Sequence, residues 1–95
     1  MTFRLRFTAE ADIQFRNLPG PKLKKVKRTL GFLQTNPRHP SLNTHLYSDV
    51  ENPFHPGGQV FESYAENQTS GAYRIFWCYG PERLQITVIA ITPHP

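Results

Sequence analysis

The feature that most constrains this chain is an apolar run near its C-terminal end. The segment 84–92 is apolar at most positions and carries β-branched side chains at Ile86, Val88, Ile89 and Ile91. A strand of this composition is typically buried on both faces and paired on both sides in a sheet. We therefore predict a central or nearly central strand here, and the fold must place another strand on each side of it.

Several other segments are predicted to supply those neighbours. Residues 59–65 and 72–79 are rich in strand-forming residues, and residues 67–71 between them are typical of a hairpin turn. Residues 80–83 form a second turn, so the C-terminal part of the chain predicts a three-stranded antiparallel meander. The opening segment 3–7 alternates apolar and basic residues, which indicates a strand with one buried face. We expect this first strand to lie beside the last one.

Two helices are predicted between the first strand and the meander. Thr8 can cap a helix whose first turn holds Glu10 and Asp12, where the helix dipole favours negative charge. The Leu-Pro-Gly-Pro sequence at 18–21 ends this helix and begins another, which stops by Asn36. One apolar stripe runs along the second helix: Leu23, Val26, Leu30 and Leu33. With so short a join, the helices should form an antiparallel hairpin.

These elements predict an α+β fold with the helix pair packed on one face of the sheet and the other face open to a ligand. A chain of 95 residues suits a single domain over 1–95. Residues 37–58 are rich in Pro, Gly, His and Asn and predict a long loop, with a turn of helix near 42–46. A loop of this length is often functional in so small a domain.

The cysteine content and hydropathy exclude several classes of protein. The single cysteine, Cys78, excludes an internal disulfide framework and a zinc site built on cysteines. It lies in an apolar run and is interpreted as a small buried side chain. A chain without disulfides fits the reducing cytoplasm. No apolar run reaches the roughly 18 residues that cross a membrane, so we expect no membrane association.

The chain is basic, with 11 Lys and Arg against seven Asp and Glu and a net charge of +4. Such an excess suits an anionic partner. Five of the cations lie in the first half of the second predicted helix: Lys22, Lys24, Lys25, Lys27 and Arg28. These side chains form either a solvated helix face or a contact with a polyanion, and the sequence is compatible with both.

The predicted hairpin brings one acidic and one basic residue together on the open face. If residues 67–71 form the turn, antiparallel pairing places four side chains on that face: Glu62, Tyr64, Arg74 and Phe76. Glu62 and Arg74 are then either a cross-strand ion pair of little energetic value or parts of a site. In such a site Arg74 would hold a phosphate, and Glu62 would act as a base or orient one.

The four histidines, His39, His45, His55 and His94, form no familiar metal spacing, so we expect no metal site. Histidine is also the side chain best suited to proton transfer near neutral pH. Each has a simpler interpretation. His94 can be part of a frayed terminus, while His39 and His45 can be exposed or can cap the predicted helical turn.

Read in order, these segments resemble a known family. The segments that carry the likeness are Asn-Pro-Arg-His-Pro-Ser-Leu-Asn-Thr-His-Leu at 36–46, Val-Phe-Glu-Ser-Tyr at 60–64, Tyr-Arg-Ile-Phe-Trp at 73–77 and Ile-Ala-Ile-Thr-Pro-His at 89–94. Together with the helix pair they resemble the RelE/ParE superfamily, the toxins of bacterial type II toxin–antitoxin systems, and within it the RelE/YafQ-like branch.

The resemblance implies a cytoplasmic toxin that cuts mRNA, often on the ribosome, and so inhibits translation. It implies no metal and no small-molecule cofactor, and a cognate antitoxin as partner. In such enzymes a base removes the proton of the ribose 2′-OH, whose oxygen attacks the adjacent phosphorus. An arginine stabilises the developing charge, and an acid protonates the leaving 5′-oxygen.

The resemblance also implies roles for individual residues. Arg74 matches the arginine of the penultimate strand, His94 is similar to the histidine after the last strand, Glu62 to an acidic residue used as base, and His45 to the loop histidine of YafQ-like members. Contact with RNA is implied for the basic residues Arg4, Arg6, Lys22, Lys24, Lys25, Lys27 and Arg28.

Two alternatives remain open at this stage. The lysine-rich middle strand of the RelE branch is absent, because residues 59–65 contain neither Lys nor Arg. A ParE-like toxin that inhibits DNA gyrase without cutting nucleic acid is one alternative. A non-toxic relative that acts as a binding module is the other.

Overall fold

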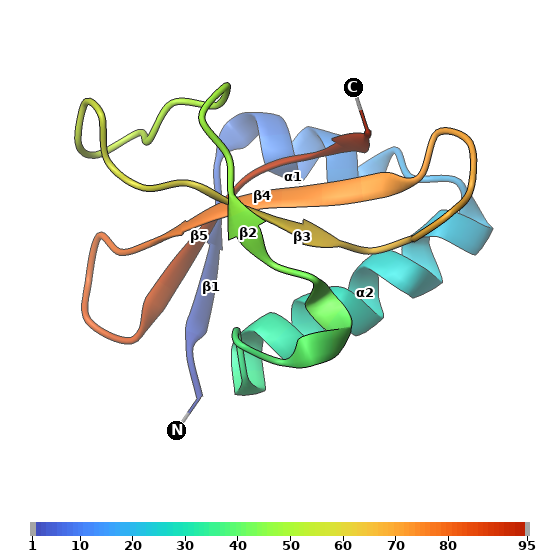
Figure 1. Ribbon diagram of the computed structural model, residues 1–95, viewed down its shortest axis with the longest axis horizontal. Coiled ribbons are helices and arrows are strands. Elements are labelled where there is room, and N and C mark those ends of the chain that lie inside the picture. Colours follow the sequence, from blue (N-terminus) through green and yellow to red (C-terminus); the bar gives the residue numbers. More distant parts are fainter. Residues whose placement is uncertain (1, 95) are drawn as a thin grey trace.

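The computed structural model describes residues 2–94. Along the chain its elements are β1 (Arg4–Phe7), α1 (Ala9–Arg16), α2 (Gly20–Thr35), the 3-10 turn η1 (Pro40–Leu42), β2 (His45–Leu46), β3 (Phe61–Tyr64), β4 (Tyr73–Tyr79) and β5 (Gln85–Pro93). This is the predicted α+β order of a strand, two helices and a meander, with one short additional strand, β2 (Figure 1).

The strands form one five-stranded mixed sheet in the order β1-β5-β4-β3-β2. The apolar strand β5 pairs in parallel with β1 and in antiparallel fashion with β4, so it has a neighbour on each side as predicted. Its core-facing side chains Ile86, Val88 and Ile91 are at most 2 % exposed. The N-terminal strand therefore does return beside the last strand, because the long apolar run needs cover on both of its edges.

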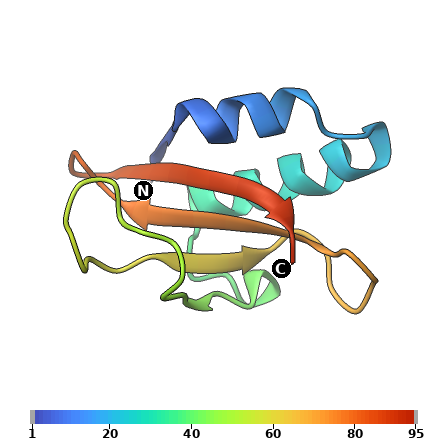
Figure 2. The same ribbon diagram turned by 90° about the horizontal axis from the view of Figure 1, so that it is seen from above.

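Both helices begin where the sequence predicts. The Thr8 hydroxyl accepts a hydrogen bond from the Ala11 backbone N–H at 3.1 Å and donates one to the Ile89 carbonyl at 2.8 Å, which ties the start of α1 to β5. A proline occupies the first turn of α2, where its missing N–H costs nothing. The helices run in opposite directions on one side of the sheet (Figure 2).

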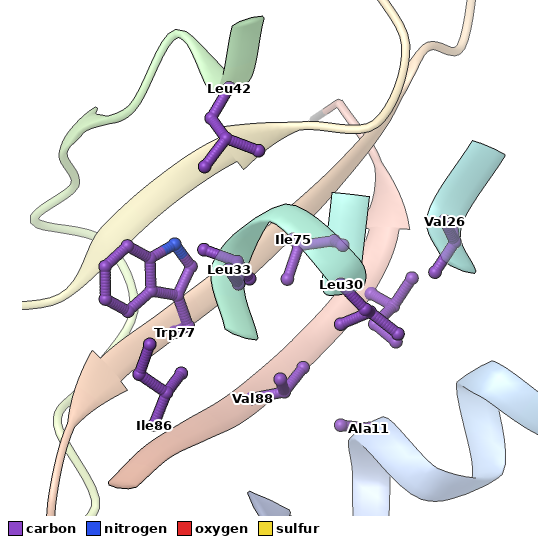
Figure 3. Close-up of a cluster of buried hydrophobic side chains, with 10 residues drawn as sticks. Ala11, Val26, Leu30, Leu33, Leu42, Ile75, Trp77, Ile86 and Val88 are labelled. Carbon is purple, nitrogen blue, oxygen red and sulfur yellow. The ribbon is translucent and has the colours of Figure 1, made fainter. Parts of the chain in front are cut away.

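The main core lies between the helices and the sheet. Figure 3 shows Leu30 and Leu33 of α2 against Ile75 and Trp77 of β4, with Leu42 of η1 closing one end. The Trp77 indole N–H donates a hydrogen bond to the Ser63 hydroxyl at 2.8 Å, so this buried polar group is satisfied.

The expectation that the other face of the sheet is open is wrong for part of its area. A second apolar cluster lies there, made of Val60, Phe76, Cys78, Ile89 and Ala90, and the loop 47–58 covers it with Tyr47, Val50 and Phe54. In Figure 2 this loop crosses in front of β4 and β5, on the side away from α2. The physical reason is that β4 and β5 are apolar on both faces, so the second face also needs cover. Cys78 is fully buried there, as predicted.

The helical turn predicted near 42–46 is displaced towards the N-terminus. The 3-10 turn η1 is capped by His39, whose ring Nδ1 accepts a hydrogen bond from the Ser41 N–H at 3.1 Å. Asn43, at a φ of 48°, ends it in the left-handed region that Asn tolerates. The chain can then extend, and His45 and Leu46 pair with β3 as the edge strand β2. Local propensity alone does not reveal this pairing.

Candidate functional site

The site is built on the hairpin formed by β3 and β4. The observed pairs are Phe61 with Trp77, Glu62 with Phe76, and Tyr64 with Arg74, which is the register expected from the sequence. Because side chains alternate across a strand, Glu62, Tyr64 and Arg74 share the face away from the helices. The alternate residues, such as Ile75 and Trp77, lie in the main core.

Glu62 lies at the centre of a cluster that we call the Glu62 cluster, made of Glu62, His45, Arg74 and His94. One carboxylate oxygen of Glu62 is 2.5 Å from His45 Nε2, and the other is 3.8 Å from both Arg74 Nε and His94 Nδ1. The structure thus brings together four residues that span positions 45 to 94 of the sequence.

Exposure divides the cluster into two layers. The side chains of Glu62 and Arg74 are 2 % and 6 % exposed, whereas those of His45 and His94 are 47 % and 52 % exposed. A ligand that approaches from solvent therefore meets the two imidazoles, and the carboxylate and guanidinium support them from below.

Backbone hydrogen bonds hold both histidines in place. His45 lies directly opposite Glu62 in the β2–β3 ladder, and its Nδ1 is 3.1 Å from the Asn43 carbonyl. The His94 N–H donates to the Ala72 carbonyl at 2.7 Å, which continues the β4–β5 pairing beyond the strand. His94 is therefore anchored to β4, and the interpretation of this residue as part of a frayed terminus is wrong.

Arg74 has several partners beneath the surface. Its guanidinium lies 3.6 Å from the centre of the Tyr64 ring, and its NH1 donates to the backbone carbonyls of Glu66 at 2.5 Å and Tyr73 at 3.4 Å. Its Nε–H faces Glu62 without a hydrogen-bond acceptor among the described residues. These contacts fix the plane of the guanidinium, so its charge is held next to the carboxylate.

The predicted RNA-binding residues do not form one uniform surface. Lys22 and Lys25 donate to the Glu66 carboxylate, at 2.8 Å and 3.1 Å, so their charges are partly used inside the molecule. Arg28 lies over the Phe32 ring at 5.7 Å, while Lys24 and Lys27 are exposed.

Arg4 and Arg6 belong to β1, at the opposite edge of the sheet from His45. Both are exposed, and Arg6 lies over the ring of Phe54 in the loop 47–58. The loop covers the sheet between this edge and the Glu62 cluster, so the two arginines do not join the cluster.

Sequence reasoning missed Glu66 and the part played by Tyr64. The Glu66 carboxylate accepts hydrogen bonds from the ammonium groups of Lys22 and Lys25 and from the Tyr73 backbone N–H. Burial alone would raise the pKa of its carboxyl, but hydrogen bonds from Lys22, the Tyr73 N–H and Lys25 outweigh burial and lower the pKa from 4.5 to about 2. The one signal in the sequence is the three-residue spacing of Lys22 and Lys25, which places both on one side of a helix.

The remaining histidines lie outside the cluster: His39 stacks on Phe32 at 4.2 Å, and His55 is exposed in the loop 47–58. Within residues 2–94, no group of three or more His, Cys, Asp or Glu side chains has an arrangement that would hold a metal ion. Across the same residues, the helices are too short or too polar to span a membrane.

Comparison with solved structures shows which known proteins share this fold. No protein-family model and no curated protein sequence matches the chain. The matched chain of the archaeal RelE–RelB complex of Pyrococcus horikoshii OT3 has a TM-score of 0.69 at 13 % identity, covering 98 % of this chain and 96 % of that one. The YoeB/ParE toxin of Agrobacterium tumefaciens has a TM-score of 0.70 at 11 % identity, covering 98 % and 100 %.

The chain in the intact E. coli RelBE toxin–antitoxin complex has a TM-score of 0.64 at 17 % identity, and 98 % of both chains is covered. At such low identity a likeness over nearly the whole chain establishes the architecture, while activity depends on the residues of the site. This chain therefore has the fold of the RelE- and YoeB-type toxins.

Proposed function

We propose that this chain is the toxin of a type II toxin–antitoxin pair and acts as a metal-independent endoribonuclease that cuts mRNA and stops translation. The observation that carries the proposal is the Glu62 cluster: two accessible imidazoles beside one buried carboxylate, with the guanidinium of Arg74 against that carboxylate. Cleavage of RNA requires a base, an acid and positive charge near one phosphodiester, and this cluster offers all three.

The proposed reaction uses the RNA's own 2′-OH as nucleophile. A base removes the proton of that hydroxyl, and its oxygen bonds to the adjacent phosphorus. The bond from phosphorus to the 5′-oxygen of the next nucleotide breaks, and an acid gives that oxygen a proton. The products are a 2′,3′-cyclic phosphate and a free 5′-OH, so neither water nor an added nucleophile enters this step.

The hydrogen-bond partners favour His45 as the acid and His94 as the base. Both ring nitrogens of His45 lie near acceptors, Nδ1 at 3.1 Å from the Asn43 carbonyl and Nε2 at the Glu62 carboxylate, so one N–H must turn towards the leaving 5′-oxygen when this ring acts as the acid. His94 meets Glu62 through Nδ1 only, at 3.8 Å, and its Nε2 takes part in no hydrogen bond or ion pair with the described residues, so this nitrogen is the one that would accept the proton. Glu62 orients both rings and is too buried to take the 2′-OH proton itself.

Arg74 supplies fixed positive charge close to the reacting phosphate. Its guanidinium is held by Tyr64 and by backbone carbonyls, and it does not have to reorganise when negative charge develops. Removing such a pre-oriented charge typically costs a factor of about 10² to 10³ in rate.

The test is controlled expression followed by mapping of transcript ends. Wild type should arrest growth and create new 5′ ends within mRNA. His45→Ala, His94→Ala and Arg74→Ala should each reduce cleavage by about 10² or more, since each removes a group with a defined role. His55→Ala is the matched control, because His55 is exposed outside the cluster.

Two outcomes contradict the proposal. If the three cluster variants stay as toxic as wild type, the Glu62 cluster is not catalytic. If transcripts stay intact while DNA supercoiling fails, a gyrase-inhibiting toxin like ParE is favoured instead. Cleavage by purified protein should also persist in excess EDTA, and its loss there would contradict a metal-independent reaction.

The proposed partner is a cognate antitoxin, encoded by a small reading frame beside this gene. Two of the matched structures are toxins bound to RelB-type antitoxins, which supports a protein partner of this class. Co-expression of the neighbouring frame should restore growth, and the two proteins should co-purify.

A further inference from the structure

A second concave site lies at the free edge of β3, beside the Glu62 cluster. It is a cavity of about 270 Å³ between α2, η1 and the end of β3, and we call it the edge pocket. Its walls include Lys25, Arg28 and Phe32 from α2, Ser41 and Asn43 from η1 and the residue after it, and Tyr64 from β3. The edge is free because β2 covers β3 only at Glu62 and Phe61.

The edge pocket is positively charged. The Glu66 carboxylate in its wall is 2 % exposed and binds both Lys22 and Lys25, so this carboxylate is more than neutralised. Arg28 forms no salt bridge with any carboxylate of the described residues. The charge that remains to attract a ligand is therefore cationic, which suits a phosphate group.

The edge pocket also contains flat rings and groups that can form hydrogen bonds. Phe32 is stacked on His39 with ring centres 4.2 Å apart, and Arg28 lies over the same ring at 5.7 Å. Ser41 and Asn43 add a hydroxyl and an amide from the opposite wall. The Phe32 ring is thus already engaged by its neighbours, and the groups left for a nucleotide are polar side chains for base edges and cations for phosphate, both of which serve in binding single-stranded RNA.

Two residues join the edge pocket to the Glu62 cluster. Tyr64 forms part of its wall, and the ring of Tyr64 lies 5.8 Å from the ring of His45. Asn43 forms another part, and its carbonyl is 3.1 Å from His45 Nδ1. A strand whose phosphodiester lies at His45 is therefore separated from the edge pocket by these two residues alone, at the free edge of β3.

We propose that the edge pocket binds the nucleotide of the RNA strand next to the scissile phosphodiester, with its base beside Ser41 and Asn43 and its phosphate on Arg28. The inference rests on the proposed function, because it places the cut at the Glu62 cluster. The inference gives different roles to two cations of α2: Arg28 contacts the substrate, whereas Lys22 pairs with Glu66 inside the fold.

The test measures binding and does not depend on cleavage. The probes are uncleavable 2′-O-methyl RNA oligonucleotides: a dinucleotide with one phosphodiester and two trinucleotides extended by one residue at the 5′ or the 3′ end. Calorimetry with the full chain should show that one trinucleotide binds more tightly than the dinucleotide. Arg28→Gln should lower the affinity for that trinucleotide about tenfold, as expected for a lost charge-assisted hydrogen bond. The affinity for the dinucleotide should stay unchanged.

Arg83→Gln is the matched control, because Arg83 is an exposed arginine in the β4–β5 turn, outside the edge pocket. Equal affinities of wild type and Arg28→Gln for both trinucleotides would overturn the inference, even if transcripts are cut in cells. Competition by a short oligoglutamate peptide as strong as by the trinucleotide would also overturn it, and would assign the pocket to an acidic protein segment. A chain that binds the trinucleotide through Arg28 but cuts no RNA would contradict the proposed function alone.

Discussion

At the scale of single residues, the buried position of Glu62 is what organises the site. A carboxylate that is 2 % exposed needs positive charge nearby: one of its oxygens contacts His45, while the other has Arg74 and His94 at 3.8 Å but no hydrogen bond within the described residues. The same geometry argues that Glu62 acts through its neighbours. In the proposed reaction it is therefore a positioning residue that does not contact the substrate directly.

Glu62→Gln tests that role. The amide keeps the size of the side chain but removes the charge that orients both imidazoles, so kcat should fall by about 10² while KM changes little. The measurement is steady-state cleavage of an RNA substrate, with Glu51→Gln, an exposed carboxylate of the loop 47–58, as control. A rise in KM with kcat unchanged would show instead that Glu62 contributes to substrate binding.

At the scale of elements, the salt bridges of Glu66 attach α2 to the β3–β4 hairpin. Lys22 and Lys25 reach down from the helix, and the Glu66 carbonyl receives Arg74 NH1 from the neighbouring strand. One residue thus links the basic helix, the hairpin turn and the arginine of the site.

The lowered pKa of Glu66 predicts a loss of stability in acid. Its pKa is about 2 in the folded chain against 4.5 ordinarily, so the folded state favours the ionised carboxylate. This stabilisation is complete above about pH 4.5 and is lost as the pH falls towards 2. It amounts to at most about 3 kcal/mol, since the partner Lys25 is half exposed to solvent.

Chemical denaturation between pH 6 and pH 2 measures this effect. Wild type should lose more free energy of unfolding than Glu66→Gln over that range. Asp12→Asn, which breaks the exposed pair of Asp12 with Arg16, should behave like wild type to within about 0.5 kcal/mol. If Glu66→Gln follows the wild-type curve, the acid sensitivity arises from other carboxylates.

At the scale of the whole molecule, the sheet separates two apolar clusters. The helices cover one face, and the loop 47–58 covers part of the other. The Asn52 side chain braces this loop, because it accepts hydrogen bonds from the N–H groups of Phe54 and His55 and donates one to the Gln59 carbonyl. The loop thereby confines access to the end of the sheet where the Glu62 cluster lies.

The buried thiol of Cys78 reports whether the loop opens. Burial raises the pKa of this thiol, and the cluster that contains it is covered by Phe54, so wild type should react slowly with a thiol reagent. Phe54→Ala removes part of the cover and should speed labelling about tenfold or more. The control is Ile13→Ala, an exposed apolar residue of α1. Equal labelling rates of wild type and Phe54→Ala would mean that the reagent reaches Cys78 only when the whole protein unfolds.

Several features of the site were predictable because they depend on neighbours in the sequence. The length of the 67–71 turn sets the register of β3 against β4, and alternation then places Glu62 and Arg74 on one face. The paired residues lie within a few residues of the turn, so an error in the predicted pairing can be only small. Whether these residues catalyse a reaction is a separate prediction that the experiments above address.

Other features depend on where distant segments meet. The edge pairing that brings His45 to Glu62 involves two residues of β2, too few to leave a pattern in the sequence. The partners of Glu66 come from a helix 41 and 44 residues earlier in the chain. The cover of the second face comes from a loop whose composition resembles that of an exposed segment.

The amino-acid order by itself therefore determined the two helices, the strands β1, β3, β4 and β5, the alternation of faces along them and the place of β5 between two neighbours, since capping, turn length and apolar periodicity act over a few residues. Only the tertiary structure decided which cations remain free, how deeply Glu62 is buried and which part of the sheet stays accessible. Those properties depend on contacts between segments that are far apart in the chain. Local conformational preference does not determine them, because they arise only when the folded chain brings these segments together.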